Sequence, residues 1–191
     1  MLYLLTSTRT PLVVALLALV CICQPRAQTA SISCPVDTAL VWTGCRGTLV
    51  KDGHTYTGEF LNNQFHGKGA YWFSDGDYFN GTFKNGLPDG WGVYVFASDD
   101  KRKGDRYVGD FHQGQAQGRG TTFFHTGAVY AGQYVAGLPE GLGIYLSREG
   151  VVLHEGVWRA GKFVASAPVR FLSEAEAFRV TELNTYQQSN E

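Results

Sequence analysis

The sequence predicts an all-β protein: an elongated antiparallel meander of β-hairpin repeats in a single twisted sheet, with a short C-terminal helix. Three observations lead to this prediction. Glycine is abundant, with 24 among 191 residues, and aromatic residues make up 14% of the chain. An aromatic-x-Gly-x-aromatic pattern returns about every 23 residues along most of the chain. This composition is typical of short strands joined by tight turns, and the fixed period indicates a repeat architecture.

The first 30 residues are predicted to be a signal peptide. Arg9 is the only charged side chain before an apolar run from Pro11 to Cys23, and the small residues Ala27 and Ala30 follow. This is the layout of a secretory signal, and the run is shorter than the ~20 apolar residues that a membrane-spanning helix needs. We therefore expect an exported protein, periplasmic or extracellular. An uncleaved N-terminal anchor is the alternative.

The charge of the exported chain argues against a nucleic-acid partner. Removal of residues 1–30 would leave 14 basic and 17 acidic side chains, a net charge of −3. A weakly acidic protein has no general electrostatic attraction to nucleic acid or to anionic lipid. Partners of those two kinds are therefore not predicted from charge.

Residues 31–53 are predicted to form an N-terminal cap. Cys34 and Cys45 are the two cysteines that remain after the signal, and in an oxidising compartment they are expected to pair as a disulfide. The pairing would stabilise the fold by roughly 2–4 kcal/mol. A half repeat follows at Gly47–Val50, with a turn at Asp52-Gly53.

The repeat array is predicted over residues 54–164. Four copies are well matched and a fifth, His154–Trp158, lacks the paired glycines. Five extra residues fall in the loop around Ser98–Lys103, between the second and third copies. The signature positions are Tyr56, Gly58, Phe60, Gly67 and Gly69; Gly81, Phe83, Gly90 and Gly92; Tyr107, Gly109, Phe111, Gly118 and Gly120; Tyr130, Gly132, Tyr134, Gly141 and Gly143.

Each copy is interpreted as one β-hairpin. Side chains alternate between the faces of a strand, so Tyr56, Gly58 and Phe60 share one face and Thr57 and Glu59 take the other. Glycine normally weakens a strand, and its recurrence here is explained if the large rings lie over bare backbone. A tight turn is predicted where the copies hold only glycine or asparagine, the residues that tolerate a left-handed backbone: Asn63, Gly86, Gly114, Gly137 and Gly161.

Residues 165–191 are predicted to hold a short helix and a polar tail. Ser173-Glu-Ala-Glu176 has the pattern of a capping box, which opens a helix that would run through about Val180. From Leu183 onward the sequence is mostly polar.

The recurring pattern Tyr-x-Gly-x-Phe-x-x-Gly-x-x-x-Gly-x-Gly resembles the MORN repeat (membrane occupation and recognition nexus). The resemblance covers roughly Gly44 to Phe163. It implies an elongated antiparallel sheet of hairpins and roles in protein assembly, dimerisation and, in some members, phospholipid association. Typical units often carry Glu and Lys around the aromatic-Gly core, which gives some members basic faces. These positions hold Thr57, Asn80, Val108 and Ala131 here, which weakens the lipid expectation. The export signal makes the chain more similar to exported bacterial members.

No catalytic or metal-binding set is predicted, and no cofactor is expected. The histidines form no metal-binding pair, and His66 is interpreted as a surface residue flanking a turn. Glu59 and Asp110 occupy the same column, which holds Gln133 and Thr82 in other copies, so a solvated face is favoured over a carboxylate pair. Lys101–Lys103 could contact phosphate, but the flanking acidic residues favour a solvated loop.

The functional prediction is therefore a non-catalytic exported module that acts as a protein-binding scaffold or assembly factor, open to homodimerisation. The alternative is a carbohydrate- or cell-wall-binding module, or one that associates with membrane lipid. Trp72, Trp91 and Trp158 could stack on sugar rings, although a place in the core is favoured for them. Trp72 lies on the opposite face from Tyr71 and Phe73, which makes it the best ligand-contact candidate.

Overall fold

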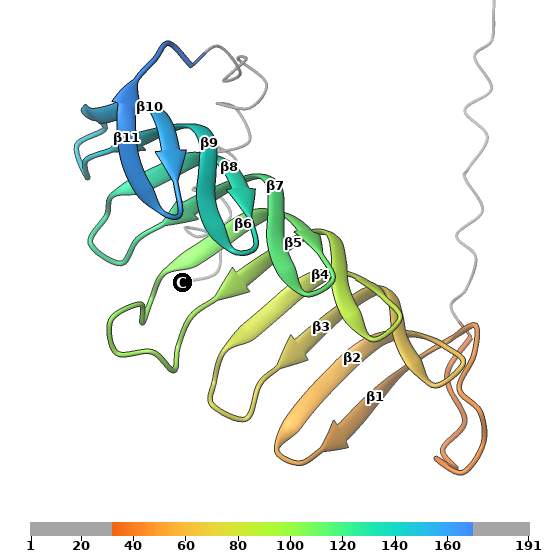
Figure 1. Cartoon of the computed structure of the whole chain (residues 1–191). Coiled ribbons are helices and arrows are strands. Elements are labelled where there is room, and N and C mark those ends of the chain that lie inside the picture. The colour runs from red at the N-terminus through yellow and green to blue at the C-terminus, as the bar shows by residue number, and fades with distance from the viewer. Residues whose placement is uncertain (1–31, 170–191) are drawn as a thin grey trace, which may run out of the picture. The chain divides into compact units, whose positions relative to one another are not determined.

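A computed structural model describes residues 32–169, and within them the chain forms one 11-stranded antiparallel sheet (Figure 1). The predicted signal peptide at 1–30 and the predicted helix from Ser173 to Val180 lie outside the described residues. The strands are β1 (Cys45–Lys51), β2 (His54–Leu61), β3 (Gln64–Trp72), β4 (Tyr78–Lys84), β5 (Leu87–Val95), β6 (Arg106–His112), β7 (Gln115–Phe123), β8 (Val129–Val135), β9 (Leu138–Leu146), β10 (Val152–Arg159) and β11 (Lys162–Ser166).

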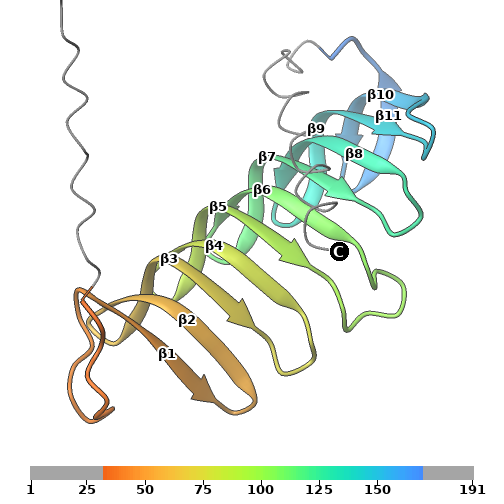
Figure 2. The same cartoon turned by 180° about the vertical axis from the view of Figure 1, so that it is seen from behind.

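The strands follow one another across the sheet in chain order, from β1 to β11, with every neighbour antiparallel. The same order can be followed from behind in Figure 2. A meander of this kind needs only short turns, because each strand pairs with the one before and the one after it. The predicted all-β meander in a single sheet is thereby confirmed.

A continuous row of glycines crosses the sheet, one from each of β1 to β10. Each glycine stands opposite the glycine of the neighbouring strand. We call this row the glycine ladder: Gly47, Gly58, Gly69, Gly81, Gly92, Gly109, Gly120, Gly132, Gly143 and Gly156. It leaves a strip of the sheet with no side chains on either face.

The first ring of the aromatic-x-Gly-x-aromatic pattern lies over this strip in each copy. A Cβ atom added at Gly81 would stand 2.7 Å from the Phe79 ring and 2.6 Å from the Cα of Gly92. Tyr56, Tyr107 and Tyr130 lie over their own glycines in the same way. The expectation that the rings pack on bare backbone is confirmed, and it explains why glycine occupies the middle of the strands.

The rings also interlock from one repeat to the next. Each first ring meets the edge or face of the second ring of its own copy and that of the following copy, in T-shaped pairs. The contacts between copies are Tyr56–Phe83 at 5.0 Å and Phe79–Phe111, Tyr107–Tyr134 and Tyr130–Trp158 at 4.9 Å between ring centroids. Edge-to-face pairs contribute about 0.5–1.5 kcal/mol beyond their buried area. Side-chain packing therefore joins adjacent hairpins in addition to the backbone ladder.

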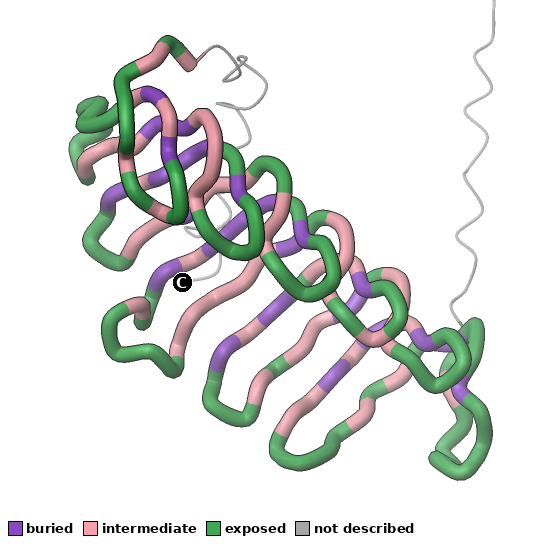
Figure 3. The backbone as a smooth tube through the Cα atoms, viewed as in Figure 1, coloured by how far each residue is buried: buried purple, intermediate pink, exposed green. Residues whose placement is uncertain are grey.

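These rings make up most of the buried core, and they all lie on one face of the sheet, which we call the ring face. Figure 3 shows the buried positions spaced along strands that are otherwise partly exposed. At the N-terminal end, Trp42 caps the row with a T-shaped contact to Phe60 at 4.8 Å. The predicted disulfide between Cys34 and Cys45 is present beside it.

The turn between the strands of each hairpin has the predicted left-handed backbone. The φ angle is 63° at Asn63 and 85° at Gly86, and it is also positive at Gly114, Gly137 and Gly161. Inside each hairpin the second strand also carries a bulge at the first glycine of Gly-x-Gly, as between Gly58 and Glu59 of β2 and their partners on β3. The bulge leaves a backbone amide without a ladder partner on the preceding strand.

The side chain at the position of Glu59 in three of the copies accepts a hydrogen bond from this amide. The amide of Lys68 donates to Glu59 Oε1 at 3.3 Å, and that of Arg119 donates to Asp110 Oδ2 at 3.3 Å. The amide of Leu142 donates to Gln133 Oε1 at 2.8 Å. These side chains therefore have a structural role that their interpretation as a solvated face did not include.

The glycine ladder gives a first test. We expect Gly81→Ala to lower the free energy of unfolding by about 1–3 kcal/mol, because the new methyl group would overlap Phe79 and the β5 backbone. Gly86→Asn is the matched control, since Asn63 already occupies the corresponding turn with a positive φ. Urea unfolding of both variants measures the difference. Equal stability of the two variants would contradict the role assigned to the ladder.

The tyrosine hydroxyls give a second test. Burial raises the pKa of Tyr56 from its ordinary value of 10.0 to about 12, while its hydroxyl donates to the Glu59 carbonyl at 2.9 Å. The folded chain holds this proton more tightly than the unfolded chain, so its contribution to stability is complete below pH 10 and is lost as the pH rises through 12. We expect Tyr56→Phe, which mimics Phe79, to show a shallower loss between these pH values in urea unfolding. An unchanged pH profile would contradict this account.

Candidate functional site

A second set of rings lies on the ring face and is only partly buried. They come from the second strand of the hairpins and the residues just after it, and they pack against the edge of the core. Ring centroids are 4.6 Å apart for Tyr71–Phe73 and Tyr94–Phe96, 5.7 Å for Phe73–Tyr94 and 5.8 Å for Phe124–Tyr145. We call Tyr71, Phe73, Tyr94, Phe96, Phe124 and Tyr145 the outer ring row. It follows the same direction across the sheet as the core.

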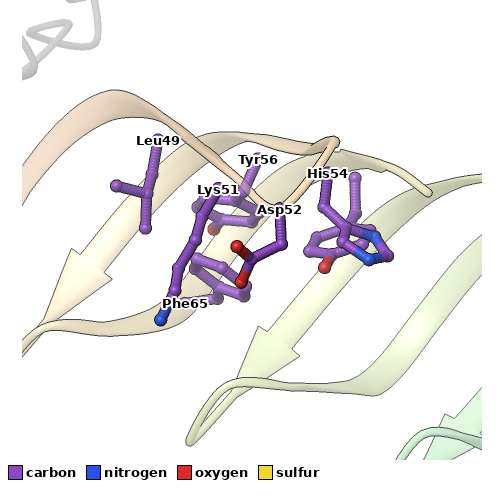
Figure 4. A pocket seen from close by; sticks show the side chains of 7 residues that line it. Leu49, Lys51, Asp52, His54, Tyr56 and Phe65 are labelled. Atoms are coloured by element: carbon purple, nitrogen blue, oxygen red, sulfur yellow. The ribbon is translucent and has the colours of Figure 1, made fainter. Parts of the chain in front are cut away.

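A shallow pocket lies at the N-terminal end of this row (Figure 4). It is lined by the apolar side chains of Leu49, Tyr56, Phe65 and Tyr71 and by the polar side chains of Lys51, Asp52 and His54. Tyr56 and Phe65 stack at 4.0 Å. Phe65 is replaced in the later copies by Pro88, Ala116 and Pro139, which occupy the same place in the pairing. The pocket is therefore a feature of the first copy.

A buried carboxylate fixes the loop beside the outer ring row. Asp77 accepts hydrogen bonds from the amides of Ala97 and Ser98 at 2.8 and 2.9 Å, and from the Tyr94 hydroxyl at 2.6 Å. Burial by itself would raise the pKa of Asp77, but these hydrogen bonds outweigh it and hold the pKa below its ordinary value. Burial, together with the negative Asp77, raises the pKa of Tyr94. Asp77 thus holds the inserted loop and one ring of the row in place.

The next copy has a related arrangement at Asp105. Its Oδ1 accepts a hydrogen bond from the amide of His125 at 2.9 Å and lies 2.8 Å from the His125 ring nitrogen Nδ1. Arg102 lies 3.7 Å from the other oxygen of Asp105, and its guanidinium covers the Phe96 ring at 3.6 Å. The basic side chain in the middle of the Lys101–Lys103 run therefore packs on the protein itself, while Lys101 and Lys103 are exposed.

The face opposite the rings, which we call the rear face, carries two exposed tryptophans. Trp72 is 43% exposed and Trp91 is 48% exposed. The prediction that Trp91 lies in the core is wrong. Gly92 belongs to the glycine ladder beneath Phe79 on the ring face, so Trp91, the preceding residue of the strand, lies on the rear face. The core prediction is correct for Trp158, since this ring is buried and its Nε1 donates to the Gly143 carbonyl at 3.2 Å. Trp72 lies on the face predicted for it.

The sequence candidates for chemistry are not brought together. Among residues 32–169 there is no cluster of three or more histidine, cysteine, aspartate or glutamate side chains suited to hold a metal ion. Glu59 and Asp110 are separated by three strands and serve as separate backbone acceptors. His66 is half-buried rather than at the surface, and its Nδ1 has no hydrogen-bond partner in the described part of the chain. The described residues also include no helix long and apolar enough to cross a membrane.

Comparison with known proteins finds the same repeats. The MORN repeat family matches residues 56–78, 79–101, 107–129 and 130–152. The unmatched residues 102–106 overlap the end of the inserted loop, and the degraded fifth copy is outside the matches. Over 140 residues, 73% of this chain, the sequence is 31% identical to rat (Rattus norvegicus) Alsin and 30% identical to mouse (Mus musculus) Alsin. The match covers 8% of the length of each relative.

The hydrogen bonds that Asp77 accepts, which we call the Asp77 clasp, give a third test. Asp77→Ala would leave the Ala97 and Ser98 amides and the Tyr94 hydroxyl without their acceptor, and loss of such a buried acceptor costs about 1–3 kcal/mol. We expect urea unfolding to show this loss near neutral pH. The loss should shrink as the pH falls below 3.8, because the lowered pKa of Asp77 stabilises the fold only while the carboxyl is ionised. Asp100→Ala, an exposed change in the same loop, is the control and should be neutral. Equal effects of the two variants would contradict the clasp.

Proposed function

Because the chain belongs to the MORN-repeat family, we propose that it is an exported, non-catalytic module that binds a protein partner along the ring face of its sheet. MORN repeats are generally modules of protein or membrane association. In this proposal the array acts as a scaffold: it holds a segment of the partner against the outer ring row.

The outer ring row is the observation that carries the proposal. Six aromatic side chains lie partly exposed on the same face as the buried core. Partly exposed apolar clusters of this kind mark interaction sites, and aromatic anchors contribute most of the energy at protein interfaces. From β3 to β9 the row crosses six strand spacings, roughly 29 Å. The surface therefore suits an extended or helical peptide with apolar side chains along its length.

Two features support export. The apolar run from Pro11 to Cys23 has the layout of a secretory signal. The disulfide between Cys34 and Cys45 is of a kind that persists in the periplasm or outside the cell and is rare in the cytosol. A periplasmic or extracellular scaffold combines both features.

The scaffold proposal is tested with ring-face and rear-face variants. We expect photo-crosslinking in the native envelope, followed by mass spectrometry, to identify a partner that is lost in the double variant Phe73→Ser/Tyr145→Ser. These two rings are partly exposed, so removing their contacts should weaken binding at least tenfold, in keeping with hot-spot energies of more than about 1.4 kcal/mol. Trp72→Ser/Trp91→Ser is the matched control on the opposite face. Loss of the partner in the control alone would contradict the proposal.

The exposed Trp72 and Trp91 favour one second candidate, carbohydrate or cell-wall binding. Trp72 lies 5.1 Å from Tyr78 in a tilted ring pair, and flat aromatic faces of this kind can stack on sugar rings. Binding of purified peptidoglycan that is abolished by Trp72→Ala would support this candidate. Association with membrane lipid would appear as sedimentation with anionic vesicles at low salt, and a homodimer as doubled mass in light scattering.

A further inference from the structure

Two tryptophans on the rear face are not required by the fold. Trp72 and Trp91 are exposed and take no part in the ring packing on the glycine ladder. The corresponding places in the other copies hold different side chains: Val95, Phe123 and Leu146 for Trp72, and Lys68, Arg119 and Leu142 for Trp91. An exposed tryptophan offers a large flat apolar area to a ligand. The two rings are therefore candidates for ligand contact.

The register of the sheet places Trp72 and Trp91 on a diagonal across β3, β4 and β5. Trp72 pairs with Tyr78 of β4, and Tyr78 pairs with Val95 of β5. Trp91 precedes Val95 by four residues on the same strand. Two strand spacings are roughly 10 Å and four residues of strand are roughly 13 Å, so the two backbone positions are about 16 Å apart. A ligand that contacts both rings must be extended.

Asn80 lies at the middle of this diagonal. It stands on β4, between the two tryptophan strands, and pairs with Ala70 of β3 and Val93 of β5. Ala70 is two residues from Trp72 and Val93 is two residues from Trp91, so the backbone of Asn80 is equally far from both. The Asn80 side chain is exposed, and its amide group both donates and accepts hydrogen bonds. A ligand along the diagonal meets a polar group halfway between two flat apolar ones.

The surface beneath such a ligand is nearly free of charge. The two rows that contain Trp72 and Asn80 have no acidic or basic side chain from β2 to β5: Thr55, Trp72, Tyr78 and Val95 in one, and Thr57, Ala70, Asn80 and Val93 in the other. In the row of Trp91, the acidic Asp110 stands on one side and the basic Lys68 on the other. Complementary potentials select binding partners, and this surface is complementary to an uncharged ligand.

An oligosaccharide chain has the chemistry that this surface matches. Its sugar rings present flat C–H faces that stack on aromatic side chains, and its hydroxyl groups form hydrogen bonds with amides and hydroxyls. The Thr57 hydroxyl, 2.9 Å from that of Thr48, adds polar groups in the row of Asn80. Ligand sites combine aromatic surface with a few placed polar groups in this way. Nucleic acids and acidic peptides carry charges that this surface does not match.

We propose that Trp72, Asn80 and Trp91 form a site for an uncharged, extended glycan chain on the rear face of β3 to β5. The chain stacks on a tryptophan at each end and forms hydrogen bonds with Asn80 between them. Because the ring face is the opposite side of the same sheet, the array holds a glycan and a protein at once. This link rests on the scaffold proposed above, whereas the glycan site itself does not.

Titration with soluble glycans tests the site, read by tryptophan fluorescence and calorimetry. The other two tryptophans, Trp42 and Trp158, are buried, so a fluorescence change reports on Trp72 and Trp91. The probes are chitohexaose and cellohexaose, uncharged β-linked chains that differ in the acetamido group. We expect at least one of them to bind. Its two-sugar fragment should bind at least about tenfold more weakly, because a ligand that short reaches one ring only.

Single substitutions then locate the site. Trp72→Ala and Trp91→Ala should each weaken binding of the hexasaccharide at least about fivefold, because each removes an aromatic anchor. Asn80→Ala should weaken it about threefold through loss of hydrogen bonds. Leu87→Ala is the matched control, since Leu87 is 50% exposed and Trp91 is 48% exposed on the same face of β5. It should leave binding unchanged, and urea unfolding checks that every variant is folded.

Failure of both hexasaccharides to bind would overturn the proposal. So would binding that survives Trp72→Ala and Trp91→Ala, that is lost equally in Leu87→Ala, or that is as strong for the two-sugar fragment. The ring-face variant Phe73→Ser/Tyr145→Ser separates this proposal from the scaffold, because it should release the protein partner and retain the glycan. Glycan binding by a chain that captures no protein partner would contradict the scaffold and support the glycan site.

Discussion

The packing of aromatic rings on the glycine ladder is the contact on which the rest of the structure depends. A single sheet has no partner layer to bury its apolar side chains, so the rings need another apolar surface. The bare backbone of ten aligned glycines provides it. The ring of Phe79 covers Gly81 and Gly92 on two adjacent strands, and the Tyr56 hydroxyl then reaches the Glu59 carbonyl at the bulge. A buried core one ring thick results, without a second sheet.

Because of this core, each repeat is stabilised by contacts with the adjacent repeats. Tyr107, for example, contacts Phe111 of its own copy and Tyr134 of the next, so each repeat is held by the two beside it. In arrays of this kind the total stability is close to a sum over repeats and their interfaces. Residues between hairpins contribute little to that sum, which explains how the array accommodates five extra residues in the loop around Ser98–Lys103. The loop still needs its own support: Asp77, just before β4, accepts a hydrogen bond from the Ala97 amide, and Asp105, just before β6, lies 3.7 Å from Arg102.

The fold could be predicted from the sequence because its determinants are local and periodic. Alternation within the strand assigned Tyr56 and Glu59 to opposite faces, and the glycine or asparagine column located the turns. The outer ring row, the Asp77 clasp and the bulge acceptors were not predicted, because each depends on which residues of different strands meet. A core place was favoured for Trp91 over a sugar-stacking role, and the structure leaves it exposed. Its place between Gly90 and Gly92, whose face was already predictable, was the signal that could have corrected this.

The two faces of the sheet have different requirements, and this difference bears on function. On the ring face every copy must keep a glycine beneath a ring, so variation there is confined to the outer ring row and to positions such as Phe65, where later copies have proline or alanine. On the rear face no core ring packs on the backbone, so glycine is not required. Threonine, asparagine, valine and isoleucine replace one another along a single row there. The rear face can therefore change in polarity along the array without loss of the fold. A protein with such a sheet can combine a repetitive apolar binding surface on one side with a surface specific to each copy on the other.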